Sequence, residues 1–402
     1  MTPGADDILE ALDLSRAEPG AGFLEALFAR FNAKVPFENA SKIVRDAEVA
    51  DANAKPRTPD VFWADHLESG TGGTCFARVA AFQALLTELG FRSRRLLGKV
   101  QRDDDHAALL VETAAGESIV DVGFPLPAIL PARAGAAATN RGELVVAETP
   151  RGFRVEFREA VPEGPRALEV FSAPVSDERF AALWRDTYRA GSRFLRDVCL
   201  RRDLGNRVLS FAMGEIRVDD LHSRLRLPLS AEPEAALAEH FGVDAGILSL
   251  AFARAGRPTP TGEEPTLTAY LETSVSPAAA FDAIATAGGY RRLVGGMAEV
   301  VAESEIPGGF RVTLAAPGGD PAAGIDEDVI VEPAAQRISV KRSRGGSTTT
   351  SSYRALERGG QTYLLRETVL PGRRDELLRN DSLRGRYAGA LAVDLLAWAR
   401  IL

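Results

Sequence analysis

The side chain with the clearest potential for chemistry is Cys75, which ends the glycine-rich run 70–75 (GTGGTC). From Cys75 to Leu89 the apolar residues recur at helical spacing and Gly90 follows as a stop signal, so the pattern predicts a helix. With Thr74 as N-cap, Cys75 would lie in the first turn, where unpaired N–H groups and the helix dipole favour a nucleophilic thiolate. The glycines would leave room for a substrate carbonyl. The alternative is a small cysteine buried in an apolar helix.

A nucleophilic cysteine needs a base, and the chain has four histidines. His106 precedes the apolar run 107–111, so we expect it to be the first residue of a strand. Asp121 interrupts the next apolar strand, 118–124, where a carboxylate is costly unless it is paired. A histidine on the neighbouring strand would pair it, which gives Cys75 as nucleophile, a base and a group that orients the base. The alternatives are a surface histidine and a carboxylate that caps a turn.

Four segments carry these and related residues: 35–39 (VPFEN), 72–76 (GGTCF), 106–111 (HAALLV) and 120–124 (VDVGF). In this order and with these separations they resemble the arylamine N-acetyltransferase (NAT) family, over residues 1 to about 255. The resemblance implies a catalytic triad of Cys75, His106 and Asp121. It also implies acetyl-CoA or another acyl-CoA as donor, and an aromatic amine or hydrazine as acceptor, with an acyl-Cys75 intermediate.

The resemblance further implies that Phe37 and Phe124 bind the acceptor, although both could simply pack in the core. Backbone N–H groups near Cys75 would stabilise the oxyanion. The run of acidic residues 103–105 reads as a solvated loop rather than a cation site, and its charge would raise the pKa of the adjacent His106.

Four positions depart from the pattern of the family. Its usual arginine before the two glycines is Thr71, its usual glutamate and asparagine after the cysteine are Ala77 and Val79, and a usual glycine is Pro125. These changes leave three other functions open besides acyl transfer from CoA to an amine. They are a NAT-like amide synthase of a biosynthetic pathway, a transglutaminase- or protease-like hydrolase, and a catalytically inactive protein that binds a ligand.

Composition narrows the class of protein. Of the 402 residues 45% are hydrophobic and 26% charged, which is ordinary for a globular protein. The formal net charge of −8 argues against a general affinity for nucleic acid or anionic membranes. Two cysteines make no disulfide framework, and the acidic residues 1–10 make no secretory signal, so we expect a cytoplasmic protein without a membrane span. The absence of CxxC and HExxH predicts no metal site.

The predicted fold class is α+β, with a NAT-like domain over 1–255, a linker over 256–264 and a second domain over 265–402. The first domain would combine an N-terminal helical bundle with a β-barrel subdomain around a cysteine-protease-like core. The second resembles the START-like (SRPBCC) helix-grip fold, which implies an apolar ligand, with a filled core as the alternative. The expected elements that matter below are strands at 92–100, 106–113 and 117–124, a loop at 46–59, a connection at 125–140, and helices at 277–285 and 374–402.

Overall fold

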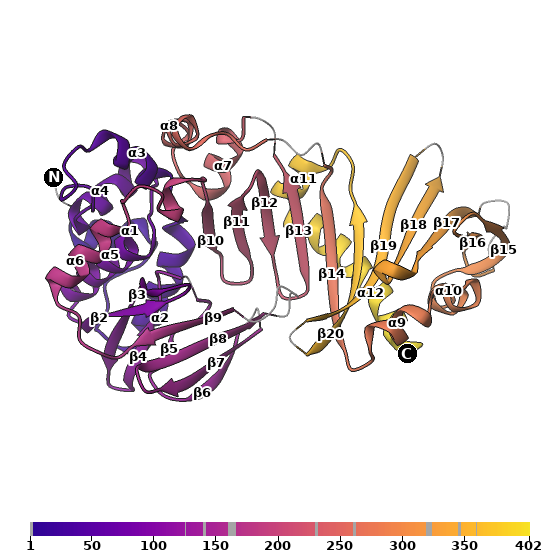
Figure 1. The fold of residues 1–402 in the computed structure, drawn as a ribbon, viewed down its shortest axis with the longest axis horizontal. Helices are drawn as coiled ribbons and strands as arrows, with labels where there is room; N and C mark the ends of the chain where they lie inside the picture. Colours follow the sequence, from indigo (N-terminus) through magenta and orange to yellow (C-terminus); the bar gives the residue numbers. More distant parts are fainter. Residues whose placement is uncertain are drawn as a thin grey trace. The chain divides into compact units, whose positions relative to one another are not determined.

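The computed structural model describes residues 3–124, 126–139, 142–159, 166–229, 232–259, 263–318, 324–344, 347–358 and 360–402. The chain divides into two compact units, each described by itself (Figure 1). The first unit comprises Met1–Arg158, Pro165–Val218 and Leu229–Thr261, and the second comprises the remaining residues. Residues 219–228, which the sequence predicts in the first domain, pack with the second unit. Part of the predicted linker, 260–262, lies outside the described residues.

The helices of the first unit form at the places where apolar residues recur at helical spacing. They are α1 (Ala5–Ala11), α2 (Ala21–Lys34), α3 (Ala40–Glu48), α4 (Pro59–Ser69), α5 (Cys75–Glu88), α6 (Asp177–Asp186), α7 (Glu234–Phe241) and α8 (Ala245–Ala255). Helix α4 begins with Pro59 after Thr58, whose hydroxyl accepts the N–H of Val61, and it ends at Gly70 in the left-handed conformation. The predicted loop over 46–59 overlaps α3, which the sequence pattern did not predict.

One antiparallel sheet of the first unit carries the neighbours of the expected site. Its strands, in spatial order, are β5 (Leu130–Pro131), β4 (Gly116–Val120), β3 (Asp103–Thr113), β2 (Arg92–Lys99), β9 (Arg166–Phe171), β8 (Gly152–Glu159), β7 (Gly142–Thr149) and β6 (Gly135–Thr139). The predicted connection at 125–140 therefore contains strands in its described part. A second run of strands pairs in the order β1 (Phe37–Glu38), β10 (Leu200–Asp203), β11 (Val208–Ala212) and β12 (Glu215–Asp219).

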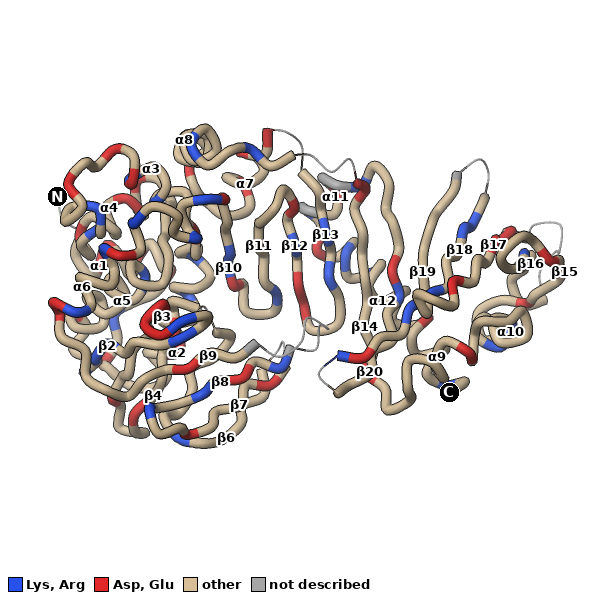
Figure 2. The backbone as a smooth tube through the Cα atoms, viewed as in Figure 1, with Lys and Arg blue, Asp and Glu red and all other residues tan. Residues whose placement is uncertain are grey.

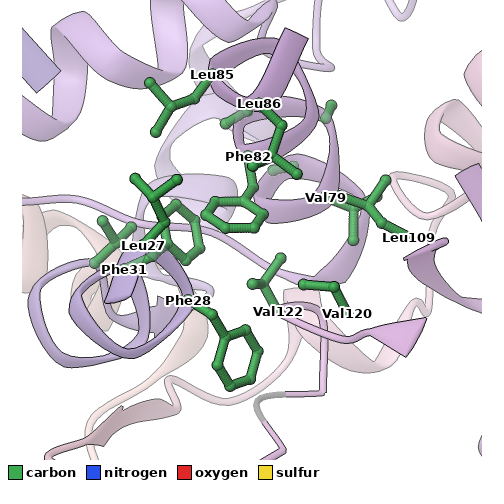
Figure 3. Close-up of a cluster of buried hydrophobic side chains, with 14 of the residues drawn as sticks. Leu27, Phe28, Phe31, Val79, Phe82, Leu85, Leu86, Leu109, Val120 and Val122 are labelled. Carbon is green, nitrogen blue, oxygen red and sulfur yellow. The ribbon is translucent and has the colours of Figure 1, made fainter. Parts of the chain in front are cut away.

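The core of the first unit lies between α5, α2 and the sheet. The ring of Phe82 of α5 packs against that of Phe31 of α2 in a tilted arrangement, with 4.8 Å between the ring centres. Figure 3 shows side chains from both helices meeting Leu109 of β3 and Val120 of β4. These residues are fully buried, and each large apolar side chain removed from water contributes about 1.5–3 kcal/mol. The core therefore fixes α5, and with it Cys75, against β3 and β4.

The second unit is a twisted antiparallel sheet with helices. Its strands pair in the order β13 (Ser223–Pro228), β14 (Thr266–Thr273), β20 (Gln361–Val369), β19 (Ser347–Arg358), β18 (Arg337–Arg344), β17 (Ile325–Glu332), β16 (Gly309–Ala315) and β15 (Glu299–Ile306). Its helices are α9 (Pro277–Asp282), α10 (Ala287–Val294), α11 (Arg374–Arg379) and α12 (Asp381–Arg400), and α12 packs on β14 and β20.

Two helix predictions for the second unit are wrong in detail. The single helix expected over 374–402 is two helices, because Asn380 adopts an extended backbone and its side chain caps α12 by accepting the N–H of Leu383 at 2.9 Å. The helix expected over 277–285 ends at Asp282, and α10 follows after Thr286, whose hydroxyl accepts a backbone N–H of the new helix. The START-like assignment itself stays a prediction.

Charged residues of both signs are interspersed along the chain in both units (Figure 2). None of the helices in the described ranges is long and apolar enough to cross a membrane. Within those same ranges, no group of three or more His, Cys, Asp or Glu side chains is placed to hold a metal ion.

Candidate active site

Cys75 is the first residue of α5, and the chain before it is held in place by a neighbouring segment. The N-cap is Thr74, as predicted from the sequence, although its side chain makes no capping hydrogen bond. Gly73 pairs with Phe37 of β1, since its carbonyl accepts the N–H of Glu38 at 3.2 Å. A Cβ on Gly72 would lie 1.8 Å from the Pro36 oxygen, so only glycine fits there. Cys75 thus begins a helix whose first N–H groups lack intrahelical acceptors.

His106 and Asp121 meet beside this helix end. His106 is the fourth residue of β3 rather than its first, because the strand begins at Asp103. Asp121 lies just beyond β4, which ends at Val120, so the predicted strand over 117–124 is too long. The Nε2 atom of His106 lies 2.7 Å from Oδ2 of Asp121, and both residues are almost fully buried.

The second oxygen of Asp121 fixes the carboxylate. Its Oδ1 accepts the backbone N–H of Phe124 at 2.7 Å, so the residue closes a turn as well as pairing with His106. The two roles that the sequence left as alternatives, pairing and turn capping, are therefore both filled by this one carboxylate. Because Nε2 of His106 faces Asp121, the other ring nitrogen, Nδ1, is the one available to Cys75.

The imidazole of His106 is favoured in its charged form. Burial alone would lower its pKa, but the charge and hydrogen bond of Asp121, together with the side chain of Cys75, raise the pKa of His106 to about 10. The acidic run 103–105 is not the cause. Instead, the carboxylate of Asp105 accepts the backbone N–H groups of Val100, Gln101 and Arg102 and so shapes the loop that leads to His106. The ring that faces Cys75 therefore carries a positive charge at neutral pH.

These residues line a pocket of about 690 Å³. Cys75 and His106 lie in its wall together with the two predicted acceptor-binding residues, Phe37 and Phe124. The Phe124 ring stands edge-on to the His106 ring at 6.4 Å, and Phe37 packs in the same way against Phe194 at 5.6 Å. The structure therefore brings all five predicted site residues together, with Asp121 behind the wall. Pro125 lies outside the described residues.

Arg57 is the first residue that the sequence pattern missed. It comes from the predicted loop over 46–59, yet it is only 4% exposed. Its guanidinium donates to the carbonyl oxygen of Gly72, to the Thr71 hydroxyl at 3.2 Å and to Asp65 at 3.0 Å. The family pattern has an arginine at the position of Thr71. In this chain Arg57, which lies outside the motif, supports the glycine segment instead.

Arg78 supports the site from the other side. It is fully buried in α5 and donates to the carbonyl oxygen of Val122 at 2.7 Å, to that of Val35, and to Oδ1 of Asn32 at 2.8 Å. Burial lowers the pKa of Arg78 to about 9, against the opposing charges of Asp121 and a glutamate. The sequence carried one signal for the burial of Arg78. This residue lies about one turn after Cys75, on the apolar face of the predicted helix.

Lys42 of α3 is the third missed residue, and it lines the same pocket. It is 4% exposed, and burial lowers its pKa to about 8 while the charges of Cys75 and Asp46 oppose the shift. The other cysteine, Cys199, also lines the pocket, where burial raises the pKa of its thiol to about 12. Cys75 and Cys199 are both free thiols.

Gly123 lies where the turn after β4 passes closest to the nucleophile. A Cβ there would lie 2.5 Å from the Ala107 oxygen and 2.9 Å from the Cβ of Cys75, which real contacts do not allow. We therefore expect Gly123→Ala to displace Cys75 and slow its alkylation by iodoacetamide by roughly tenfold or more, the effect of a small misplacement at a reacting centre. Gly22→Ala is the matched control, since a methyl there meets nothing within 4 Å. Equal rates in the two variants would contradict this packing argument.

The fold of the first unit is similar to that of solved acetyltransferases, and part of its sequence matches an acetyltransferase family model. Residues 22–156 match the family model described as N-acetyltransferase. The N-arylamine acetyltransferase from Mycobacterium smegmatis superposes with a TM-score of 0.54 at 21% identity, over 63% of this chain and 97% of that chain. The Mycobacterium marinum arylamine N-acetyltransferase in complex with CoA superposes with a TM-score of 0.52 at 18% identity, over 61% of this chain and 98% of that chain. The α+β fold with its barrel-like sheet is therefore the NAT fold.

Two proteins with similar sequences are arylamine N-acetyltransferases. The chain is 34% identical to the Escherichia coli (strain K12) arylamine N-acetyltransferase over 108 residues, which is 25% of this chain and 36% of the relative. The matched region thus covers little more than a third of the length of that relative. The match lies within the predicted NAT-like domain.

Proposed function

We propose that this chain is an acyltransferase that moves an acetyl or other acyl group from a CoA thioester to an amine. The observation that carries the proposal is the His106 imidazole, which is held by Asp121 at 2.7 Å on one side and faces Cys75 on the other. Nucleophile, base and orienting carboxylate are thus in contact at the wall of a pocket.

In the first half-reaction the Cys75 thiolate attacks the thioester carbonyl. The N–H groups in the first turn of α5 stabilise the negative charge on the carbonyl oxygen. The carbon–sulfur bond to CoA then breaks, CoA leaves as a thiol with the proton from His106, and the acyl group stays on Cys75. Asp121 holds His106 in the orientation that both proton transfers need.

In the second half-reaction an amine attacks the acyl-Cys75 carbonyl. His106 takes a proton from the amine as the carbon–nitrogen bond forms, and the carbon–sulfur bond breaks to regenerate the Cys75 thiolate. The rings of Phe37 and Phe124 in the pocket wall suit an aromatic amine or hydrazine as the acceptor. The structural relative in complex with CoA supports acetyl-CoA as the donor. No metal takes part in this scheme.

The support from Arg57 favours activity over the inactive alternative. The departures at Thr71 and Ala77 remove polar groups of the family pattern, but a guanidinium still binds the Gly72 carbonyl. An amide synthase or a hydrolase would use the same acyl-Cys75, and would differ only in the group that accepts the acyl chain.

The acyl-enzyme is the test of this proposal. We expect the full chain, incubated with acetyl-CoA without amine, to gain the mass of one acetyl group on the peptide that contains Cys75. Addition of an arylamine should remove it and give the N-acetyl product, whereas Cys75→Ser should gain nothing. An unmodified Cys75 after exposure to acetyl-CoA and longer acyl-CoAs would overturn the proposal. Acyl-enzyme that transfers only to water would replace it with the hydrolase.

For the second unit we propose a START-like fold, and for the protein a cytoplasmic location. The interior near α12 is occupied by Tyr353 and Trp398, whose rings meet edge-to-face at 5.8 Å. The indole N–H of Trp398 donates to the Ala280 carbonyl at 2.9 Å, and Tyr290 donates to the buried Glu327 at 2.7 Å. This packing favours a filled core with polar contacts over a large apolar cavity.

A further inference from the structure

The pocket beside Cys75 contains a buried cation that the acyl-transfer scheme does not use. Lys42 lies in the pocket wall and is 4% exposed. Its Nζ donates to the hydroxyl of Thr187 at 2.6 Å and lies 4.5 Å from the centre of the Tyr188 ring. Thr187 lines the same pocket, so these contacts place the ammonium group at the wall and hold it there.

No carboxylate neutralises this ammonium within the part of the chain that the structure describes. Asp46 lies one turn further along α3, but its Oδ1 is 2.6 Å from Nζ of Lys55 and so serves another cation. Two other pocket cations, Arg102 and Arg189, both pair with Asp186. Burying a cation is unfavourable, and for Lys42 burial outweighs the nearby charges of Cys75 and Asp46, because the net effect is a lowered pKa.

An ammonium has three N–H donors, and Thr187 takes one of them. A carboxylate that entered the pocket would supply acceptors for the other two donors and a negative charge in direct contact with the ammonium. We propose that Lys42 binds the carboxylate of a substrate beside Cys75, so that the pocket selects acidic substrates. The effect of this binding on catalysis rests on the proposed function.

Two sources could supply this carboxylate. It could belong to the acyl group, as in the CoA thioester of a dicarboxylic acid such as malonate or succinate. It could instead belong to the acceptor, as in an aminobenzoate. Both place an anion a short distance from the carbonyl that reacts at Cys75, and both present the same chemistry to Lys42.

The first test compares iodoacetate with iodoacetamide, two reagents that differ only in a carboxylate and a neutral amide. We expect the ratio of their alkylation rates at Cys75 to fall about tenfold or more in Lys42→Met, the scale of one charged hydrogen bond. Lys42→Arg should keep most of the ratio. Arg189→Met is the matched control, because it removes the same charge from the same pocket. Equal falls in Lys42→Met and Arg189→Met, or an unchanged ratio in Lys42→Met, would overturn the proposal.

A second measurement does not depend on the reactivity of Cys75. In the Cys75→Ser protein we expect benzoate to bind about tenfold more tightly than benzamide by calorimetry, and the difference to vanish when Lys42→Met is added. Failure of the proposed function, with no acyl-enzyme from any thioester, would leave this result intact. Equal binding of benzoate and benzamide would show that Lys42 does not select carboxylates.

The substrates then separate the two sources. If the acyl group carries the carboxylate, malonyl-CoA or succinyl-CoA should acylate Cys75 faster than acetyl-CoA, and Lys42→Met should reverse the order. If the acceptor carries it, the acetyl-enzyme should react faster with 4-aminobenzoate than with aniline, and Lys42→Met should remove that preference alone. A Lys42→Met protein that keeps every preference of the native chain would refute both assignments.

Discussion

Replacing His106 with glutamine is expected to slow the alkylation of Cys75 by iodoacetamide by about a hundredfold at pH 6.5. The native imidazole keeps its proton up to a pKa of about 10, so a positive charge lies beside the sulfur through the whole neutral range. Without it, only about one per cent of an ordinary thiol, with a pKa of about 8.5, is thiolate two pH units lower. The native rate should therefore be flat across neutral pH, and the variant rate should climb towards pH 8.5.

The other cysteine is the internal control for this experiment. Burial raises the pKa of Cys199 to about 12, so its peptide should stay unmodified in both proteins across the same pH range. Peptide mass spectrometry reports the two thiols separately. A native Cys75 whose rate climbs only near pH 8.5, with no change in His106→Gln, would show an idle thiol and favour the ligand-binding alternative.

The second large effect is expected from Asp121→Asn. The asparagine oxygen can still accept the N–H of Phe124, which leaves its amide group facing Nε2 of His106. An amide donates, so Nε2 must become the acceptor and the remaining proton moves to Nδ1, which faces Cys75. In this tautomer the imidazole cannot take the thiol proton, and kcat for acyl transfer should fall by about 10⁴.

Stopped-flow acylation with acetyl-CoA would measure this loss, with Asp103→Asn as control. Asp103 lines the same pocket, but it is exposed and pairs with Arg151 at 2.8 Å. Its neutral variant should keep the acylation rate within about twofold, because exposed ion pairs contribute little. A rate loss of similar size in both variants would mean that the charge of the pocket, rather than the tautomer of His106, controls the reaction.

The triad could be predicted because each member has a local signal. Cys75 follows two glycines at the start of a clear helical repeat, and His106 and Asp121 are polar residues in otherwise apolar runs. The ends of the strands were less well predicted. The apolar run 118–124 suggested one strand, but Asp121 turns the chain by binding the N–H of Phe124, and Gly123 was the only local sign of that turn.

Two of the buried cations, Lys42 and Arg57, could not be predicted from local patterns. Arg57 lies in the polar stretch 46–59, which is typical of a solvated loop, and it is held by residues of neighbouring elements such as Thr71 and Gly72. Lys42 is held by Thr187, which is far along the chain. In the second unit the sequence also predicts strands at about 309–315, 326–332 and 361–369, and these form as β16, β17 and β20 with alternating buried and more exposed residues. The helix break at Asn380 was missed because the apolar repeat continues on both sides of it.

The guanidinium of Arg57 has a consequence for how this sequence could have evolved. Thr71 and Ala77 are small, and the space between them and Gly73 is filled by that group, which would lie 3.2 Å from a Cβ on Gly73. An arginine at position 71 alone would bury two like charges together, whereas losing Arg57 alone would leave the Gly72 carbonyl without its cation. Each single substitution is expected to lower stability. An arginine at position 71 and the arginine at position 57 would therefore replace one another only through a paired change, which is epistasis between the two positions.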